Sequence, residues 1–340
     1  MEIKKALARV VNLEDLTEKA TRSVFNEIMN GDATPSQIGA FLTALRMKGE
    51  TVEEITGAAK VMREKALKIT IPGKKVKVLD TCGTGGTGTN AFNISTTVAL
   101  VLAGCGVKVA KHGNRSASSR CGSADVLEEL GVGLDAPVNV TERCIKEINI
   151  GFLFAPLFHG AMKYASGPRR EIGVRTIFNI LGPLCNPASA THQIMGVFGE
   201  GMTKTIAKVL KNLGAKRAYV VSGKDGLDEV TITGRTKISE LKKGKIRSYH
   251  VSPRTFGFKK ARLKDIKGGT VKENARIVMN VLSGKKGPKR DVVLMNSSVA
   301  LMAAGEAKSF KEGARIAANA IDSGWAMDKL ELLIKITNER

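Results

Sequence analysis

The chain has 340 residues, of which 43% are hydrophobic and 25% charged, a composition typical of a globular protein and not of a disordered one. Its 54 Lys and Arg against 32 Asp and Glu give a net charge of +22, which attracts phosphorylated metabolites, nucleic acids or anionic membranes. Nucleic acid is the less favoured partner, because the cations are spread along the chain and aromatic residues for base stacking make up only 4%.

The sequence shows no secretory signal, and its longest apolar run, near Val98–Val107, is too short to span a bilayer. The five cysteines form no C-x-x-C pair, and the four histidines have no zinc spacing. An odd, scattered set of cysteines is typical of free thiols in a reducing compartment. We therefore expect a cytoplasmic protein with no membrane partner.

The first 70 residues are expected to form a small, all-helical domain. Apolar residues recur at helical spacing over Leu16–Met29. Thr34 is a candidate N-cap before a proline at the first helical position, and Thr51 with Glu54 forms a candidate capping box. No strand pattern interrupts this segment.

From about residue 75, strand-like and helix-like segments alternate. This alternation predicts an α/β fold with a central, mostly parallel sheet covered by helices. The predicted strands are Val76–Leu79, Val107–Ala110, Gly151–Phe154, Ala218–Val221 and Val292–Met295, and the predicted helices are Thr96–Ala103, Ser123–Gly131, Pro156–Tyr164, Thr203–Leu213 and Lys311–Ser323. The segment 168–186, which contains Pro168 and Pro183, is expected to run back to the helical domain, so that residues 71–167 and 187–340 form the α/β domain.

A glycine-rich loop, Gly83 to Gly88, follows the first predicted strand. Glycine permits close approach of the backbone to an anion, and the start of the next helix at Asn93, Ser95 and Thr96 adds donors. Helix capping is the plainer role for any one of these three side chains. The loop matches the dinucleotide pattern G-x-G-x-x-G, but its helix begins well beyond the glycines and no acidic residue follows the next strand. We therefore expect a phosphate site and not a dinucleotide site.

A second, basic loop, Lys111–Arg115, follows the next predicted strand. Ligands bind at this end of the strands in open α/β sheets. A solvated basic turn is the alternative, but the hydroxyl groups of Ser116, Ser118, Ser119 and Ser123 add anion-binding donors. The loop is therefore expected to close over the same phosphate.

Asp228 and Glu229 follow another predicted strand. Adjacent carboxylates with few other ligands suit Mg²⁺, which keeps its waters and bridges to phosphate oxygens. A surface acidic turn is the alternative, and the phosphate loop favours the metal site. Arg169 and Arg170 follow Pro168, and a guanidinium group there could clamp a substrate carboxylate, although a surface salt bridge is expected for one of the two.

Several segments, in order and over nearly the whole chain, resemble the anthranilate phosphoribosyltransferases, of the family that also includes pyrimidine nucleoside phosphorylases. These segments are Gly31–Phe41, Met47–Thr51, Lys111–Arg115, Arg175–Asn179, Leu181–Leu184 and Asp228–Glu229. The resemblance implies transfer of the phosphoribosyl group from phosphoribosyl diphosphate (PRPP) to anthranilate, a step of tryptophan biosynthesis. It also implies a hinge between the two domains, Mg²⁺ as the cofactor, and a homodimer paired through the helical domains.

The resemblance also implies roles for individual residues, none of them a certain catalytic role. PRPP would be held by Gly83, Gly86, Thr87, Asn93, Ser95, Thr96, Lys111, His112, Gly113, Asn114, Arg115, Ser116, Ala117, Ser118, Ser119 and Ser123. Anthranilate would meet Gly83, Asn114, His159 and Arg169, with His112 and His159 along its path. Mg²⁺ would be bound by Ser95, Asp228 and Glu229.

Three positions near the expected diphosphate depart from the usual residues of the family. Thr87 stands in place of Asp, Ala91 in place of Thr, and Arg120-Cys121 where Lys-Ser is common. Two alternatives stay open: a related transferase or pyrimidine nucleoside phosphorylase with another acceptor, and a non-catalytic protein that binds phosphate or nucleic acid.

Overall fold

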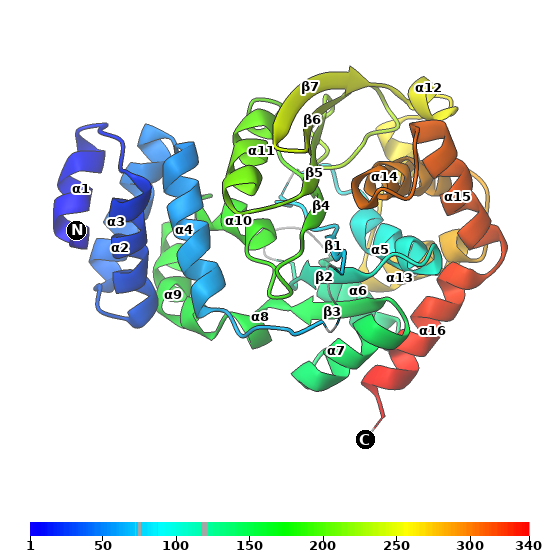
Figure 1. Ribbon diagram of the computed structural model, residues 1–340, viewed down its shortest axis with the longest axis horizontal. Helices are drawn as coiled ribbons and strands as arrows, with labels where there is room; N and C mark the ends of the chain where they lie inside the picture. Colours follow the sequence, from blue (N-terminus) through cyan, green and yellow to red (C-terminus); the bar gives the residue numbers. More distant parts are fainter. Residues whose placement is uncertain (72, 74–75, 87, 117–120, 340) are drawn as a thin grey trace.

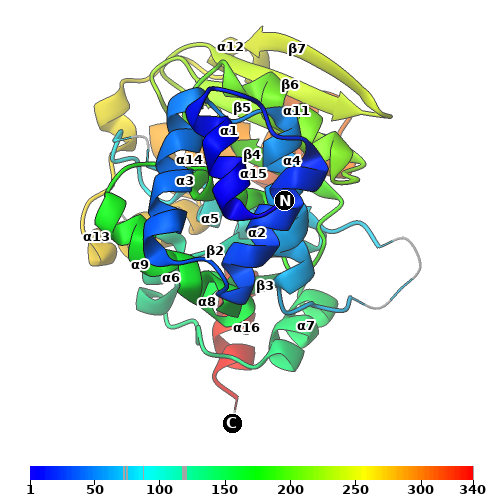
Figure 2. The same ribbon diagram turned by 90° about the vertical axis from the view of Figure 1, so that its left-hand side faces the viewer.

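The computed structural model describes residues 1–71, 73, 76–86, 88–116 and 121–339. Four N-terminal helices form a layer at one end of the molecule, and most of the remaining chain forms a sheet with helices on both faces (Figure 1). The four helices are α1 (Ile3–Val11), α2 (Glu18–Asn30), α3 (Pro35–Lys48) and α4 (Val52–Lys65). Seen from their side, they lie in front of the sheet (Figure 2).

Threonine side chains begin three of these helices. Both predicted capping residues, Thr34 and Thr51, form complete capping boxes. Glu54 of the second box is fully buried and also accepts hydrogen bonds from Leu16 N (2.9 Å) and Lys48 Nζ (3.0 Å). The Glu54 carboxylate therefore links the N-terminal ends of α2 and α4 to the C-terminal end of α3.

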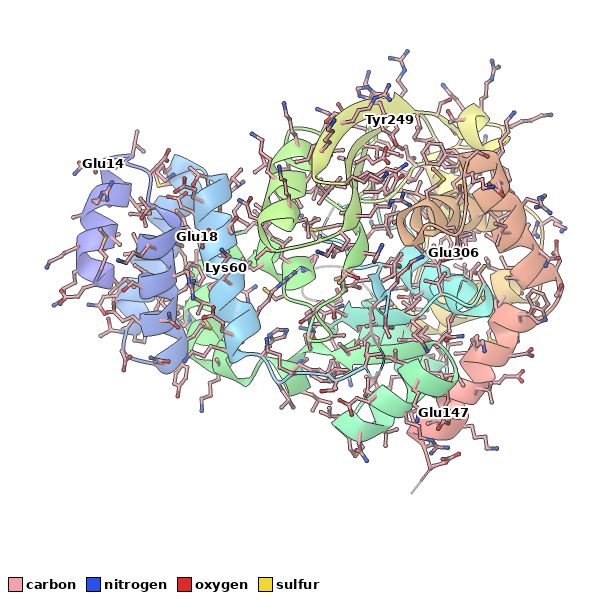
Figure 3. All side chains as sticks on the ribbon, viewed as in Figure 1. Glu14, Glu18, Lys60, Glu147, Tyr249 and Glu306 are labelled. Carbon is pink, nitrogen blue, oxygen red and sulfur yellow. The ribbon has the colours of Figure 1, made fainter. Side chains whose placement is uncertain are left out.

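A partly buried ion pair spans α2 and α4. Lys60 Nζ lies 2.6 Å from Glu18 Oε1, and the two side chains point toward each other in Figure 3. Such a pair contributes little stability, on the order of 0–1 kcal/mol. The layer is stabilised mainly by its apolar core, in which the rings of Phe25 and Phe178 lie 5.7 Å apart.

The sheet has seven strands in the order β3-β2-β1-β4-β5-β6-β7. They are β1 (Leu79–Asp80), β2 (Val109–Gly113), β3 (Ile150–Phe154), β4 (His192–Gly196), β5 (Arg217–Gly223), β6 (Thr236–Lys242) and β7 (Lys245–Val251). The first five run parallel, with Leu79 paired to Val109 on one side and to His192 on the other. The strands β6 and β7 are antiparallel and form one edge. The predicted mostly parallel sheet is confirmed.

Helices cover both faces of this sheet. They are α5 (Ile94–Gly104), α6 (Ser123–Glu129), α7 (Val138–Glu147), α8 (Ala155–Phe158), α11 (Met202–Asn212), α12 (Pro253–Phe256), α13 (Val271–Leu282), α14 (Pro288–Ala304), α15 (Phe310–Asp322) and α16 (Trp325–Thr337), with a 3₁₀ turn η3 (Leu263–Ile266). Alternate residues of β4 and β5 face opposite sides. Ile194 and Val221 join the core beneath α5 and α14, whereas Met195 and Val220 join the core beneath α11 and the N-terminal helices.

The chain returns to the helical layer in its middle third. The returning elements are η1 (Gly160–Met162), α9 (Lys163–Ile172), α10 (Phe178–Leu181) and η2 (Gly182–Leu184). Helix α9 packs on α2 and α3, and α10 on α4. The segment that returns to the helical layer therefore begins before residue 168. The division into a helical domain (1–70), a connector (168–186) and an α/β domain (71–167 and 187–340) stays a prediction.

Several predicted elements are wrong. Val292–Met295 lies inside α14 and is not a strand, because this helix is buried on almost every side and so has an apolar run without helical spacing. The predicted helix Pro156–Tyr164 is interrupted at His159, whose backbone is not helical (φ −120°, ψ 54°). The strands β4, β6 and β7 were not predicted, because β4 carries His192 and Gln193 and the edge strand β7 is largely exposed and polar.

All five cysteines are free thiols, as predicted. In the described part of the chain, every helix is too short or too polar to cross a lipid bilayer.

Candidate active site

A cavity of about 1290 Å³ lies at the carboxyl ends of the parallel strands. Its walls come from the loops after β1, β2, β4 and β5 and from the segment that returns to the helical layer. The predicted site residues that line it are Gly83, Gly86, Asn93, Ser95, Thr96, Lys111, His112, Gly113, Asn114, Arg115, Ser116, Ser123, His159, Arg169, Asp228 and Glu229. Thr87, Ala117, Ser118 and Ser119 lie outside the described residues. The structure thus gathers every described candidate around one space.

The glycine loop lies directly against the acidic pair. Gly85 N donates a hydrogen bond to Asp228 Oδ2 (2.7 Å), and Thr84 N donates to Gly196 O (2.9 Å). A Cβ on Gly83 would lie 2.7 Å from Asp228 Oδ2. Glycine is therefore required at residue 83 for the carboxylate to approach the loop.

Polar atoms at the start of α5 lack partners. Asn93 Nδ2 donates to Cys121 O (3.3 Å), but Asn93 makes no side-chain cap to the helix. Within the described residues, Asn93 Oδ1 and Thr96 Oγ1 are buried and unpaired. An unsatisfied buried polar atom costs roughly 1–3 kcal/mol. Capping does not account for these atoms, which are available to a ligand.

Lys111 places a buried positive charge beside this helix start. Its side chain is almost fully buried, and its ammonium group donates to Ser95 Oγ (3.3 Å) and Thr81 Oγ1 (3.4 Å). Its charge also lowers the pKa of both Asp228 and Glu229, against larger effects that raise it. Lys111 is therefore a cation shared among several acceptors.

Asp80 is hydrogen-bonded both to the start of the glycine loop and to the basic loop. Its Oδ1 accepts from Cys82 N (3.1 Å) and His112 N (3.3 Å), and its Oδ2 accepts from Asn186 Nδ2 (2.7 Å). Burial raises the pKa of Asp80 to about 6, while the hydrogen bond from Asn186 and the charge of Lys111 act in the opposite direction. Neither Asp80 nor Asn186 was predicted as a site residue, because only the fold brings residue 186 to residue 80.

Asp228 and Glu229 form an electrostatically unfavourable pair. Burial raises the pKa of Asp228, and it raises that of Glu229 well above its ordinary value, with the negative charge of Asp228 adding to the shift. In the described part of the chain, no group of three or more His, Cys, Asp and Glu could hold a metal ion. Two carboxylates with Ser95 Oγ nearby still fit Mg²⁺, which takes one or two carboxylates plus water and substrate phosphate.

Arg175 is a site residue to which the sequence reasoning assigned no role. Its guanidinium group stacks over the Phe198 ring (5.0 Å), and its charge lowers the pKa of Asp228. A Cβ on Gly86 would collide with this guanidinium group. Arg175 begins one of the segments that resemble the family, Arg175–Asn179, so the sequence did contain a signal for this residue.

Two histidines that line the cavity lie next to each other. The rings of His112 and His159 lie 5.1 Å apart. Burial lowers the pKa of His112 to about 3 and that of His159 to about 4, and the neighbouring ring adds to the shift at His112. His112 Nδ1 donates to Gly182 O (3.1 Å), and in the described part of the chain both Nε2 atoms are buried and unpaired. Both rings are neutral at pH 7.

The two predicted arginines differ. Arg169 is half-buried, with its guanidinium group over the Phe178 ring (4.9 Å), and burial lowers its pKa; Arg170 is exposed. Arg115 is already engaged, since its guanidinium group donates to Glu128 Oε2 (2.7 Å) and Asp125 Oδ1 (3.2 Å). Arg169 is therefore the better placed for an anionic ligand.

Comparison with known proteins identifies close relatives. Residues 4–66 match the helical bundle domain of a glycosyl transferase family, and residues 75–327 match its a/b domain. The chain is 56% identical to an anthranilate phosphoribosyltransferase of Citrifermentans bemidjiense, over 99% of both chains. It resembles the crystal structure of the Thermus thermophilus enzyme (TM-score 0.92, 41% identity, 98% and 99% coverage). It also resembles the Saccharomyces cerevisiae enzyme in complex with PRPP and Mg (TM-score 0.90, 29% identity, 98% and 97% coverage).

Replacing His159 should make the stability of the protein less sensitive to acid. An unfolded imidazole has a pKa near 6.5, so the unfolded state takes up protons first as the pH falls. The stability contributed by the neutral ring is present above pH 6.5 and is lost as the pH falls toward the folded pKa of about 4. Between pH 7 and pH 5, His159→Gln should lose about 2 kcal/mol less unfolding free energy than the wild type, measured by urea denaturation.

Burial raises the pKa of Asp80, so its effect on stability as the pH falls is opposite to that of His159. Asp80 is present in both the wild type and His159→Gln, so its effect cancels when the two are compared. His250→Gln, which changes an exposed histidine, is the control and should follow the wild type. An unchanged pH dependence in His159→Gln would show that the ring is not held neutral.

Proposed function

The chain belongs to the glycosyl transferase family of the anthranilate phosphoribosyltransferases, and on this premise we propose how its residues carry out the reaction. The enzyme transfers the 5-phosphoribosyl group from PRPP to the amine of anthranilate and releases diphosphate, with Mg²⁺ as the cofactor. The relatives support this reaction and not the phosphorylase alternative. We place the reaction in tryptophan biosynthesis and in the cytoplasm, in keeping with five free thiols.

The observation that carries the site assignment is the contact between the glycine loop and the acidic pair. Gly85 N donates to Asp228 Oδ2, so a phosphate-binding loop and a candidate metal ligand share one hydrogen bond. Binding of diphosphate beside these carboxylates requires a cation between them, because like charges repel. This arrangement suits a substrate that carries both diphosphate and metal.

The leaving group is the centre of the proposed mechanism. Bound to Ser95, Asp228 and Glu229, Mg²⁺ would neutralise charge on diphosphate as the C1–O bond breaks. Lys111 would stabilise the same charge, because its ammonium group is held by Ser95 Oγ and Thr81 Oγ1 before the reaction begins. The unpaired Asn93 Oδ1 and Thr96 Oγ1 would find partners on PRPP.

The acceptor needs positioning more than activation. The anthranilate amine is unprotonated at neutral pH and can attack directly, so correct orientation supplies much of the catalysis. The neutral rings of His112 and His159 would line the path of anthranilate without binding its carboxylate by charge. Arg169 would hold that carboxylate, and Gly83 and Asn114 would lie between the two substrates.

The activity is tested by the loss of anthranilate fluorescence, which should require both PRPP and Mg²⁺. The variant Asp228→Ala/Glu229→Ala should lose about 100-fold or more of the turnover, because it removes the metal ligands. Its melting curve should stay close to that of the wild type. Burial already disfavours the ionised forms of both carboxyl groups, so their removal should not destabilise the fold. Near-normal turnover with a normal melting curve would contradict the metal assignment.

Arg169→Ala should raise the KM for anthranilate about 10-fold, because a charge-assisted hydrogen bond contributes about 1.5–3 kcal/mol. The KM for PRPP should change much less. The matched control is Arg170→Ala, which removes the exposed neighbour and should leave both constants unchanged. Equal effects of Arg169→Ala on both substrates would count against a carboxylate clamp.

We also propose that two copies pair through their helical layers. Val11, Leu13 and Met47 are 62%, 69% and 80% exposed. The hydrogen bond from Lys48 Nζ to Asp15 Oδ1 (2.6 Å) brings together the two segments that carry Leu13 and Met47. Exposed apolar patches of this kind mark protein interfaces.

Leu13→Glu/Met47→Glu should therefore sediment as a monomer where the wild type sediments as a dimer. Met279→Glu, on α13 in the α/β part, is the control and should stay dimeric. A wild type that sediments as a monomer at micromolar concentration would overturn the proposal.

A further inference from the structure

The acidic pair lies on an irregular segment. Residues 224–235 join β5 to β6 and form neither helix nor strand. Buried backbone groups need hydrogen-bond partners, and in this segment side chains supply several of them. Asp225 Oδ2 accepts from Thr231 Oγ1 (2.6 Å) and Thr233 Oγ1 (2.7 Å), which closes the segment on itself.

Asn296, on α14, forms hydrogen bonds to the backbone of segment 224–235. Its Oδ1 accepts from Val230 N (2.8 Å), and its Nδ2 donates to Val230 O (2.9 Å) and to Val292 O (2.8 Å). One side chain therefore satisfies both backbone groups of the residue that follows Glu229. The amide is 2% exposed, and both of its N–H groups and its oxygen are used.

The helix itself does not favour asparagine at this position. Its neighbours Leu294, Met295 and Val299 are buried apolar residues. Asparagine is a poor helix former, and burial of its amide is costly unless every polar atom is bonded. The bonds to Val230 compensate this cost, so the contact with the loop explains the residue.

The other side of the acidic pair is fixed by close packing. A Cβ on Gly196, at the end of β4, would collide with the Asp228 carbonyl group. The backbone of Asp228 therefore rests on Gly196, while Asn296 holds Val230. Glu229 lies between two fixed points of the main chain.

We propose that Asn296 is a positioning residue for the metal site. By fixing Val230, it sets the directions in which Asp228 and Glu229 present their carboxylates to the metal and diphosphate. This inference rests on the proposed assignment of Asp228 and Glu229 as the ligands. Asn296 itself lines the cavity wall but is not required to touch substrate.

The test is calorimetric titration of Mn²⁺ into the protein with inorganic diphosphate, without anthranilate. Asn296→Ala should weaken Mn²⁺ binding about 10-fold or more, the usual effect of losing a residue that orients metal ligands. Asn296→Leu, which keeps the side-chain volume, should do the same if the alanine variant folds poorly. The KM for anthranilate should stay unchanged in both, which a general loosening of the site would not allow.

Ser298→Ala is the matched control, because it removes a buried hydrogen bond from the same helix to Phe310 O (2.6 Å), away from the loop. It should bind Mn²⁺ as the wild type does. Wild-type Mn²⁺ binding by the folded Asn296 variants, or equal weakening in Ser298→Ala, would overturn the proposal. Wild-type binding by Asp228→Ala/Glu229→Ala would overturn the metal assignment and the inference with it, whereas a loss confined to that variant would overturn the inference alone.

Discussion

The buried carboxylate of Asp80 is the point on which the rest of the site depends. Through its two oxygens it holds the start of the glycine loop, the backbone of His112 and the side chain of Asn186. Asn186 in turn donates to Ala110 O (2.8 Å), at the strand that leads into the basic loop. Three segments far apart in sequence thus meet at one group in the core, where a hydrogen bond is strong and an unmatched charge is costly. These hydrogen bonds fix the position of the glycine loop relative to the basic loop.

Charge is the basis of the proposed site for a cation and an anion together. The carboxylates of Asp228 and Glu229 are enclosed beside Lys111 and Arg175, and burial disfavours their ionised forms. In the proposed site, a divalent ion would relieve that cost and its charge would attract the diphosphate. His112 and His159 also line the cavity, and both rings stay neutral because burial lowers the pKa of each. The cavity therefore has a charged part around the acidic pair and a second part lined by neutral rings.

Local patterns predicted the parts of the structure that local interactions decide. The capping boxes at Thr34 and Thr51 and the glycine loop could be predicted, because residues within a few positions of one another form them. The strand prediction for Val292–Met295 was wrong, since a helix buried on all sides has no polar face to reveal its period. Asn186 and Asn296 were missed for a different reason. Their partners lie 106 and 66 residues away, and only the folded chain brings them together.

The helical layer is assembled from two separate stretches of the chain, and this has a consequence for its synthesis. Its first four helices end at Lys65, but α9, which completes their core, begins at Lys163. A ribosome that adds about 5–20 residues each second needs roughly 5–20 s to make the intervening hundred residues. During that interval, and until Phe178 of α10 has followed, the faces of Phe25 and its neighbours that pack on Phe178 lack this partner. The nascent helices are thus exposed to chaperones, and to other nascent chains, for longer than their place at the N-terminus suggests.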